Sequence, residues 1–270
     1  MSTVSLSGRT VLITGAARGL GRALALGLGV REGSNLILVD RDEPGLDRLA
    51  GRISTQSSAT VRVLVRDLLE ENRAQSLFDE LENTEVHGLV NNAGLTSFGP
   101  TEAGQLDLYR SIIELDFRLV VELSLLFLSR FKQRGGGFIC NVTSLGSFVP
   151  IPYQAIYAAA KGAVQSFSES LSVENRGGAV TICTVAPSGI VTDMIAEAGL
   201  IRHMRAHRFS YLSPEEAARQ VIRGLKRGQR LIIPGFINRL IYLAINILPR
   251  NLLLGLAGRI YDYDKYGGRD

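Results

Sequence analysis

Short apolar runs rich in β-branched residues alternate with longer helical patterns along most of this 270-residue chain. Such alternation is typical of parallel strands that are buried on both faces and joined by helical crossovers. We expect strands at 10–14, 35–40, 60–65, 86–91, 137–143, 179–186 and 230–234, and helices at 19–31, 43–53, 70–82, 101–133 and 153–175. No Pro/Ser-rich linker or internal repeat interrupts the pattern, so the sequence predicts one α/β domain over residues 1–234.

Composition excludes several other classes of protein. Hydrophobic residues make up 46% of the chain and charged residues 21%, which excludes a disordered chain. The two cysteines cannot form a disulfide framework, and both lie in apolar strand patterns, so we expect buried, inert thiols at Cys140 and Cys183. We find neither a secretory signal nor an apolar run of about 20 residues, and we therefore expect a cytoplasmic protein.

A glycine-rich turn follows the first predicted strand and leads directly into a helix. It reads Thr14-Gly-Ala-Ala-Arg-Gly-Leu-Gly21. Glycines at 15, 19 and 21 let the backbone turn sharply and approach a pyrophosphate, whose charge the helix N-terminus favours. The strand–turn–helix context favours nucleotide binding over the alternative, a tight turn that only packs the helix on the strand.

An acidic residue at the end of the second predicted strand bears on the choice of nucleotide. Asp40 follows Gly21 by 19 residues, and its carboxylate can accept hydrogen bonds from both hydroxyls of an adenosine ribose. It would also repel a 2′-phosphate and so favours NAD over NADP. Arg18 and Arg41 argue the other way, because either could pair with that phosphate.

Tyr157 and Lys161 lie one helical turn apart on the same face of a predicted helix. A nearby ammonium favours the phenolate and lowers the tyrosine pKa from its usual value of about 10. Lysine and a positively charged nicotinamide together could make this phenol a useful base at neutral pH. By itself, such a pair is also a common surface feature.

Further motifs follow in a fixed order. They are Asp67-Leu68 after the third strand, Asn91-Asn-Ala-Gly94 after the fourth, Ser144 at 13 residues before Tyr157, and Pro187-Ser-Gly-Ile190 with Thr192. Together with the glycine-rich turn and the Tyr/Lys pair, they resemble the classical short-chain dehydrogenase/reductase family over roughly residues 7–234.

The resemblance implies a Rossmann-type doubly wound parallel sheet and an NAD(P)-dependent oxidoreductase that transfers a hydride between its cofactor and an alcohol or ketone. It implies that Ser144, Tyr157 and Lys161 are catalytic. The cofactor-binding residues that it implies are Gly15, Arg18, Gly19, Leu20, Gly21, Asp40, Arg41, Asp67, Leu68, Asn92, Ala93, Gly94, Tyr157, Lys161, Pro187, Gly189, Ile190 and Thr192. Two alternatives stay open: an NADP-dependent 3-oxoacyl or lipid ketone reductase, and a cofactor-binding regulatory protein without turnover.

One position departs from the family pattern. Where the family carries an asparagine thought to hold a water in a proton relay, this chain has Asp116, in Ile113-Glu-Leu-Asp-Phe117. Aspartate can accept the same hydrogen bonds but adds a charge near Lys161. We therefore assign Asp116 to the catalytic group and expect a shifted pH dependence.

Residues 190–211 are expected to form a mobile lid over the substrate. His203 and His207 have a spacing that could hold a metal on one helix face, but no carboxylate or cysteine lies nearby, so we expect no metal and place both histidines at the lid surface. Met194, Ile195, Leu200 and Phe209 are candidates for an apolar substrate wall. By resemblance, the helices at 101–133 and 153–175 would pair subunits into a homodimer or homotetramer.

Residues 235–270 extend the chain beyond the minimal family length with apolar helical patterns and scattered arginines. Three interpretations stay open: a cap over an apolar substrate, an amphipathic membrane anchor, and a helix pair packed on the core or on a second subunit. Eight basic residues and no acidic residue lie within 217–261, so the remaining chain has 30 − 8 = 22 basic against 26 acidic residues. No aromatic–basic motif supports nucleic-acid binding.

Overall fold

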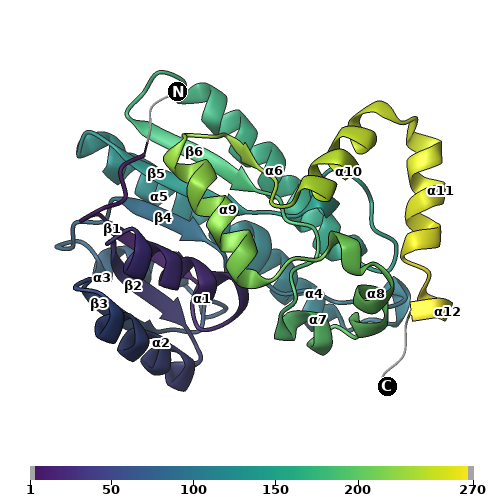
Figure 1. Ribbon diagram of the computed structural model, residues 1–270, viewed down its shortest axis with the longest axis horizontal. Helices are drawn as coiled ribbons and strands as arrows, with labels where there is room; N and C mark the ends of the chain where they lie inside the picture. Colours follow the sequence, from purple (N-terminus) through teal and green to yellow (C-terminus); the bar gives the residue numbers. More distant parts are fainter. Residues whose placement is uncertain (1–3, 267–270) are drawn as a thin grey trace.

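A seven-stranded parallel sheet forms the centre of the protein, whose computed structural model describes residues 4–266 (Figure 1). The strands are β1 (Thr10–Thr14), β2 (Asn35–Asp40), β3 (Val61–Val65), β4 (Gly88–Asn91), β5 (Gly137–Val142), β6 (Val180–Val185) and β7 (Leu231–Ile232). Their order is β3-β2-β1-β4-β5-β6-β7, and every neighbouring pair is parallel. This confirms the predicted α/β class and the doubly wound sheet.

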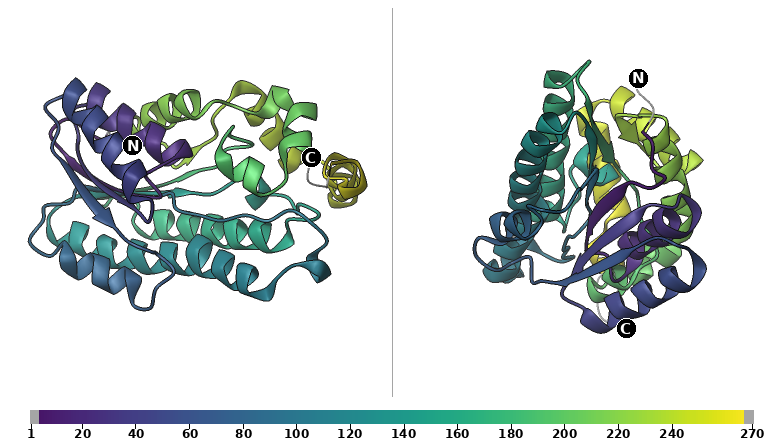
Figure 2. Two further views of the ribbon diagram at one scale, coloured as in Figure 1. Left: turned by 90° about the horizontal axis from the view of Figure 1, so that it is seen from below. Right: turned by 90° about the vertical axis from the view of Figure 1, so that its left-hand side faces the viewer.

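Helices cover both faces of the sheet (Figure 2). One face carries α1 (Gly19–Leu26), its continuation η1 (Gly27–Arg31), α2 (Glu43–Gln56) and α9 (Pro214–Lys226). The other face carries α3 (Arg73–Glu80), α5 (Leu119–Gln133) and α6 (Ala155–Glu174). The sheet is thus the middle of three layers, as a doubly wound fold requires.

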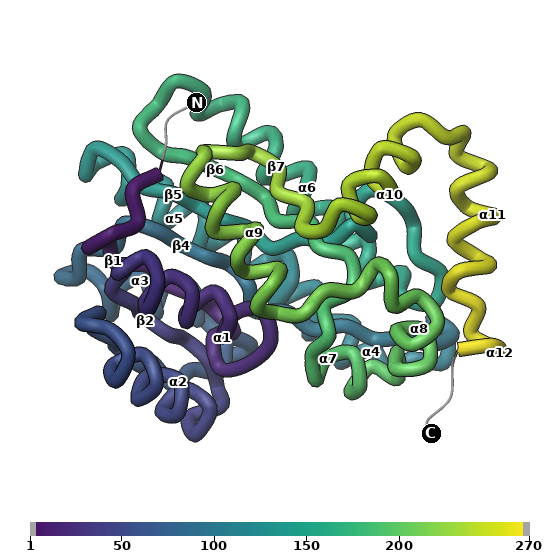
Figure 3. Tube along the Cα trace, viewed as in Figure 1, coloured from purple at the N-terminus to yellow at the C-terminus, as the bar shows by residue number. Residues whose placement is uncertain are grey.

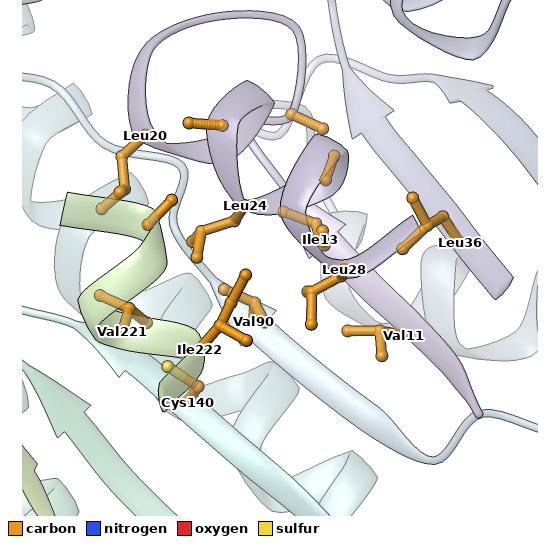
Figure 4. Close-up of a cluster of buried hydrophobic side chains, with 14 of the residues drawn as sticks. Val11, Ile13, Leu20, Leu24, Leu28, Leu36, Val90, Cys140, Val221 and Ile222 are labelled. Atoms are coloured by element: carbon orange, nitrogen blue, oxygen red, sulfur yellow. The ribbon is translucent and has the colours of Figure 1, made fainter. Parts of the chain in front are cut away.

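Side chains alternate along the central strands and build a separate core on each face. In β1, Val11 and Ile13 pack beneath α1 and α9, whereas Leu12 points to the opposite core. Figure 4 shows the first of these cores, where Leu24 of α1 and Ile222 of α9 lie over the strands. All five side chains are almost fully buried, which explains why the strands read as continuous apolar runs rather than as alternating ones.

Several predicted boundaries were wrong, among them the end of the helix expected at 43–53, which continues to Gln56, and the start of the strand expected at 86–91, which begins at Gly88. The helix expected at 70–82 begins at Arg73, after Asn72, whose φ of 54° is left-handed and cannot continue a helix. The helix expected at 101–133 is interrupted: a short turn η2 (Thr101–Ala103) precedes α4 (Leu106–Ile113), and the wide turn η3 (Glu114–Arg118) joins α4 to α5. The last strand is shorter than expected, with two residues in β7.

Short helices and the C-terminal extension surround one end of the sheet. A turn η4 (Leu145–Ser147) precedes α6, and the predicted lid contains α7 (Asp193–Glu197), α8 (Ile201–Ala206) and η5 (Arg208–Ser210). The extension folds as α10 (Phe236–Ile247), α11 (Arg250–Ile260) and α12 (Tyr263–Tyr266), and its tube runs along one side of the molecule (Figure 3). Residues 267–270 of the predicted extension lie outside the described residues. In the described part of the chain, no helix has the length and apolarity needed to cross a bilayer.

Candidate functional site

A cleft of about 460 Å³ opens at the carboxyl ends of the strands. Neighbouring β1 and β4 lie where the strand order reverses, the position at which doubly wound sheets bind ligands. The predicted site residues that line this cleft are Gly15, Arg18, Gly19, Leu20, Asp40, Arg41, Asp67, Leu68, Asn92, Ala93, Gly94, Asp116, Tyr157, Lys161, Pro187, Gly189, Ile190 and Thr192. Gly21 and Ser144 are the two predicted residues that do not line it.

The glycine-rich turn is held in a conformation that side chains would disrupt. Gly15 and Gly19 have φ angles of 64° and 55°, in the left-handed region. A Cβ on Gly21 would lie 2.0 Å from the carbonyl oxygen of Gly15, so this glycine permits close packing of the turn rather than lining the cleft. The Asn92 amide donates to the carbonyl oxygens of Thr14 at 3.0 Å and Gly15 at 2.9 Å and fixes the turn.

This turn fits the phosphates of a dinucleotide. The α1 helix begins at Gly19 and has no acidic residue in its first turn, so its N-terminus can face an anion without a competing carboxylate. A Cβ on Gly15 would come within 2.8 Å of the Ala93 backbone, so the close approach of these two segments requires glycine here. Glycine-lined space beside a helix N-terminus is the arrangement that a pyrophosphate requires.

The Asp40 carboxylate is fixed at the end of β2 by two backbone amides. One oxygen accepts from the Ala17 amide at 3.0 Å, and the other accepts from the Asp42 amide at 3.2 Å. The carboxylate therefore lies against the glycine-rich turn, where an adenosine ribose would pass. Arg18 is engaged elsewhere: its guanidinium forms a 2.7 Å ion pair with Glu197 of α7.

Ser144, Tyr157 and Lys161 converge where β5 ends and α6 begins. Lys161 is buried, and its Nζ donates to the Val142 carbonyl oxygen at 3.1 Å and lies 5.9 Å from the centre of the Tyr157 ring. The Ser144 hydroxyl accepts from the Gly146 amide at 3.1 Å and is hydrogen-bonded to the Tyr157 phenol. A hydroxyl, a phenol and an ammonium thus lie together beside one end of the cleft, which Tyr157 and Lys161 line.

Asp116 is fully buried behind this group, in the wide turn η3. Wide turns of this kind often occur at functional sites because they rotate one side chain out of helical register. Its Oδ1 accepts from the Leu95 amide at 2.8 Å, and its Oδ2 lies 3.6 Å from Lys161 Nζ. Burial raises the pKa of Asp116 to about 6, although Lys161 and the Leu95 amide act in the opposite direction.

The surroundings of Tyr157 favour the protonated phenol. Burial is the largest cause of its raised pKa, and the negative charge of Asp116 raises the pKa further. The hydrogen bond with Ser144 acts in the opposite direction, while Tyr261 of the C-terminal extension adds a small increase. These surroundings keep the tyrosine protonated at neutral pH.

The expected surface position of His203 was wrong. His203 is 3% exposed, because Tyr261 stacks on it at 4.6 Å between ring centres and His207 stacks on it at 4.3 Å. Its Nδ1 is hydrogen-bonded to the Tyr211 hydroxyl at 3.0 Å, and burial lowers its pKa to about 4. A neutral, stacked histidine joins the lid to the extension here. No cluster suited to a metal ion occurs within residues 4–266.

The predicted apolar wall is partly present. Met194 and Ile195 line the cleft, whereas Leu200 is buried within the lid segment and does not line it. Phe209 was assigned wrongly, because it is 61% exposed and does not line the cleft. Cys140 and Cys183 are buried in neighbouring strands with free thiols, as predicted.

Sequence reasoning missed the tyrosines of the C-terminal extension. Tyr261 stacks on the lid, whereas Tyr263 packs against Phe98 at 5.5 Å and Tyr153 at 5.4 Å, on the opposite side of the site. Residues 261–266 therefore join the two sides. Three tyrosines within six residues were a visible signal of a packed segment, but their partners are far away in the sequence.

Comparison with known proteins gives consistent matches over most of the chain. The family model described as short chain dehydrogenase matches residues 9–200. An 11-beta-hydroxysteroid dehydrogenase of Pinus massoniana is 33% identical over 84% of this chain and 67% of its own length. The oxidoreductase SadH of Mycobacterium tuberculosis is 31% identical over 91% of both chains.

A solved structure agrees with these relatives. It is a short-chain dehydrogenase from Sphingobium yanoikuyae in complex with NADPH, with a TM-score of 0.80, 28% identity, and coverage of 92% of this chain and 94% of that one. The shared fold, the matched family model and the coverage of the relatives all assign the chain to the same family. This chain belongs to the short-chain dehydrogenase/reductase family of oxidoreductases, which transfer a hydride between a nicotinamide cofactor and an alcohol or ketone.

Proposed function

We propose that this protein is an NAD-dependent alcohol dehydrogenase or carbonyl reductase for an apolar substrate, with Ser144, Tyr157 and Lys161 as its catalytic residues. The observation that carries this proposal is the convergence of these three side chains beside one end of a cleft whose other end is a glycine-lined turn. The test is the oxidation of NADH and NADPH by the purified protein with a series of ketones of increasing size. Absence of turnover with every ketone and, in the reverse direction, with the matching alcohols contradicts it.

The three side chains have distinct roles at the substrate oxygen. Ser144 donates a hydrogen bond to that oxygen, and Tyr157 gives it a proton in reduction or removes one in oxidation. Lys161 binds the ribose of the nicotinamide half and favours the phenolate electrostatically. The nicotinamide supplies the hydride chemistry when it is bound. Because burial raises the pKa of Tyr157, the protonated phenol serves as a proton donor in ketone reduction, and a more alkaline pH favours oxidation.

Asp116 acts as a positioning residue in this proposal. It is fully buried at the wall of the cleft, and its Oδ2 lies beside the Lys161 ammonium. The carboxylate orients that ammonium and partly offsets its charge. The proton relay of the family would then pass beside a group that can itself change charge near pH 6.

The preference for NAD rests on Asp40, whose carboxylate is held at the ribose end of the cleft. We expect Asp40→Asn to lower the ratio of kcat/KM for NAD to that for NADP by about 10- to 100-fold, because one charge-assisted hydrogen bond is lost and a repulsive charge removed. Steady-state kinetics with both cofactors measure this ratio. Asp47→Asn, the same charge change at an exposed position of α2, should leave it unchanged. Wild-type protein that prefers NADP contradicts the proposal and points to Arg18 and Arg41.

An apolar substrate fits the part of the cleft that the cofactor would leave open. Leu95, Leu108, Leu115, Met194 and Ile195 contribute to its lining. The hydroxysteroid dehydrogenase among the relatives is named for a bulky apolar alcohol. We therefore place bulky hydrophobic ketones and alcohols, with steroids as the first class to test, ahead of small polar ones.

Tyr261 holds the lid closed in this proposal. We expect Tyr261→Ala to raise the substrate KM up to about tenfold with a smaller effect on kcat, because the stack on His203 contributes about 0.5–1.5 kcal/mol. Tyr261→Phe retains the ring and should behave as the wild type. Steady-state kinetics at saturating cofactor provide the measurement, and equal KM values for all three proteins exclude a latch at this position.

Two surfaces, one on helices α4–α6 and one on the C-terminal extension, have exposed apolar side chains that suit binding partners. Exposed Leu106, Ile113, Leu125 and Val173 on α4–α6 support pairing into a homodimer or homotetramer through these helices. The extension, which we treat as a helical unit of 235–270 on the catalytic domain of 1–234, fits a membrane better than a nucleic acid, because it combines exposed apolar side chains with arginines.

A further inference from the structure

Helices α10 and α11 form a hairpin at the edge of the molecule, far from α2 (Figure 1). Its base is well anchored: Asn238 is 1% exposed and donates to the Pro234 carbonyl oxygen at 2.8 Å, and Arg239 Nε donates to the Ile233 carbonyl oxygen at 3.0 Å. Tyr242 packs edge-on against Phe148 with 4.9 Å between the ring centres. The hairpin thus has a fixed orientation on the body.

The outer face of α10 is apolar and exposed. Phe236, Leu240, Leu243 and Ile247 follow one another at spacings of four, three and four residues, so they form one stripe along the helix. Phe236 is 72% exposed and Ile247 is 79% exposed. Within the described residues, the stripe is therefore much less covered than the apolar face of a core helix would be.

The second helix shows the same division. Leu253 and Ala257 of α11 are buried and hold the helix on the protein. Leu252, Leu256 and Ile260, which recur every four residues, stay exposed in a neighbouring row. Rows of exposed apolar side chains on two consecutive helices indicate an interaction site.

The charge of the hairpin determines which partner fits. Its exposed ionised residues are Arg239, Arg250 and Arg259, and no acidic residue occurs between Phe236 and Tyr261. A second copy meeting the hairpin across a two-fold axis would bring the same arginines together, which is unfavourable. By contrast, the exposed apolar residues of α4, α5 and α6 share their helices with Asp107, Glu122, Glu169 and Glu174, a mixture that suits a protein partner.

We propose that the α10–α11 hairpin docks on an anionic lipid membrane, with the exposed apolar rows in the interface and Arg250 and Arg259 against the headgroups. Two amphipathic helices of 12 and 11 residues that carry arginines and no acids have the composition of interfacial helices, which lie on a bilayer without crossing it. Attraction of the arginines to anionic lipids adds to apolar burial.

The docked face adjoins the substrate end of the site. The chain leaves α11 at Tyr261, which stacks on His203 of the lid, and continues to Tyr263, which packs on Phe98 and Tyr153. A membrane bound to the hairpin would therefore lie beside the segment that joins both sides of the site. This part of the inference rests on the proposed apolar substrate, which such an enzyme would take from the lipid phase.

The experiment measures binding of the full-length protein to vesicles of phosphatidylcholine alone and of phosphatidylcholine mixed with phosphatidylglycerol, by flotation. We expect binding to the anionic vesicles, reduced by high salt. Arg250→Glu/Arg259→Glu and Leu240→Gln/Leu243→Gln should each weaken it at least about tenfold. Arg48→Glu/Arg52→Glu, the same charge change on exposed positions of α2, should bind as the wild type.

Any of three results overturns the proposal. The first two are no binding of the wild type to anionic vesicles and an equal loss of binding in the α2 control. The third is a lower oligomer mass of the hairpin variants in light scattering, which would assign this face to a second copy. Turnover of a water-soluble ketone or, if none is reduced, cooperative thermal unfolding shows that each variant is folded. Vesicle binding without turnover of any ketone or alcohol contradicts the proposed function and leaves the docking surface standing. Turnover without vesicle binding contradicts the docking surface and leaves the proposed function standing.

Discussion

Tyr157→Phe is expected to lower kcat at least about 10³-fold, because the phenol is the proton donor or acceptor for the substrate oxygen and phenylalanine can do neither. The ring and its packing stay, so NADH binding, measured by fluorescence titration, should change by less than about twofold. Steady-state ketone reduction gives kcat.

Tyr153→Phe is the matched control for this change. Tyr153 lies four residues earlier, packs its ring against Tyr263 and does not line the cleft. Its loss of a hydroxyl should leave kcat within about twofold of the wild type. A Tyr157→Phe enzyme that keeps a tenth of its activity removes Tyr157 from the mechanism.

Asp116→Asn should change both the pH–rate profile and the pH dependence of stability. The negative charge of Asp116 raises the pKa of Tyr157, so its removal should move the acidic limb of alcohol oxidation to lower pH. This effect should vanish below pH about 6, where Asp116 of the wild type becomes neutral. An unchanged pH–rate profile contradicts the role assigned to Asp116.

The stability effect has a defined sign. The pKa of Asp116 rises from 3.8 to about 6 on folding, so the native protein binds more protons than the unfolded chain between these values. Ionisation of Asp116 therefore destabilises the native protein. This destabilisation is absent below pH about 4 and complete above pH about 6, where it amounts to up to about 3 kcal/mol.

Urea unfolding at several pH values measures this contribution. The free energy of unfolding of Asp116→Asn, relative to that of the wild type, should increase by up to about 3 kcal/mol as the pH rises from about 4 to about 7. Asp107→Asn, with a side chain that is 91% exposed, should show a difference that hardly varies with pH. A constant difference for Asp116→Asn as well would mean that the buried carboxyl titrates normally.

Most of the lining of the cleft could be predicted from the sequence because parallel strands end at a common edge. Asp40 ends a strand, and Asp67 and Asn92 follow strands, so knowing that the strands are parallel is enough to bring them to one cleft. Lys161 follows Tyr157 by one helical turn, and local helix geometry sets that distance as well. These relations span a few residues each and need no long-range packing information.

Other features required partners that are distant in sequence. The spacing of His203 and His207 correctly predicted neighbours on one helix, but burial of His203 depends on Tyr261. Arg18 was a candidate for a 2′-phosphate, yet its nearest anion is Glu197 of the lid. The burial of a side chain or an ion pair of this kind depends on which distant segments pack together, and the local sequence does not specify those contacts.

The sequence by itself determined the doubly wound sheet, the glycine-rich turn and the family, because strand periodicity, turn chemistry and one-turn helical spacing are local properties of the chain. Only the tertiary structure decided that Asp116 is fully buried beside Lys161, that residues 261–266 join the lid to the opposite side of the site, and that the apolar rows of α10 and α11 face outward. Burial and electrostatic environment depend on contacts between residues far apart in the chain, and those contacts exist only after the layers have packed.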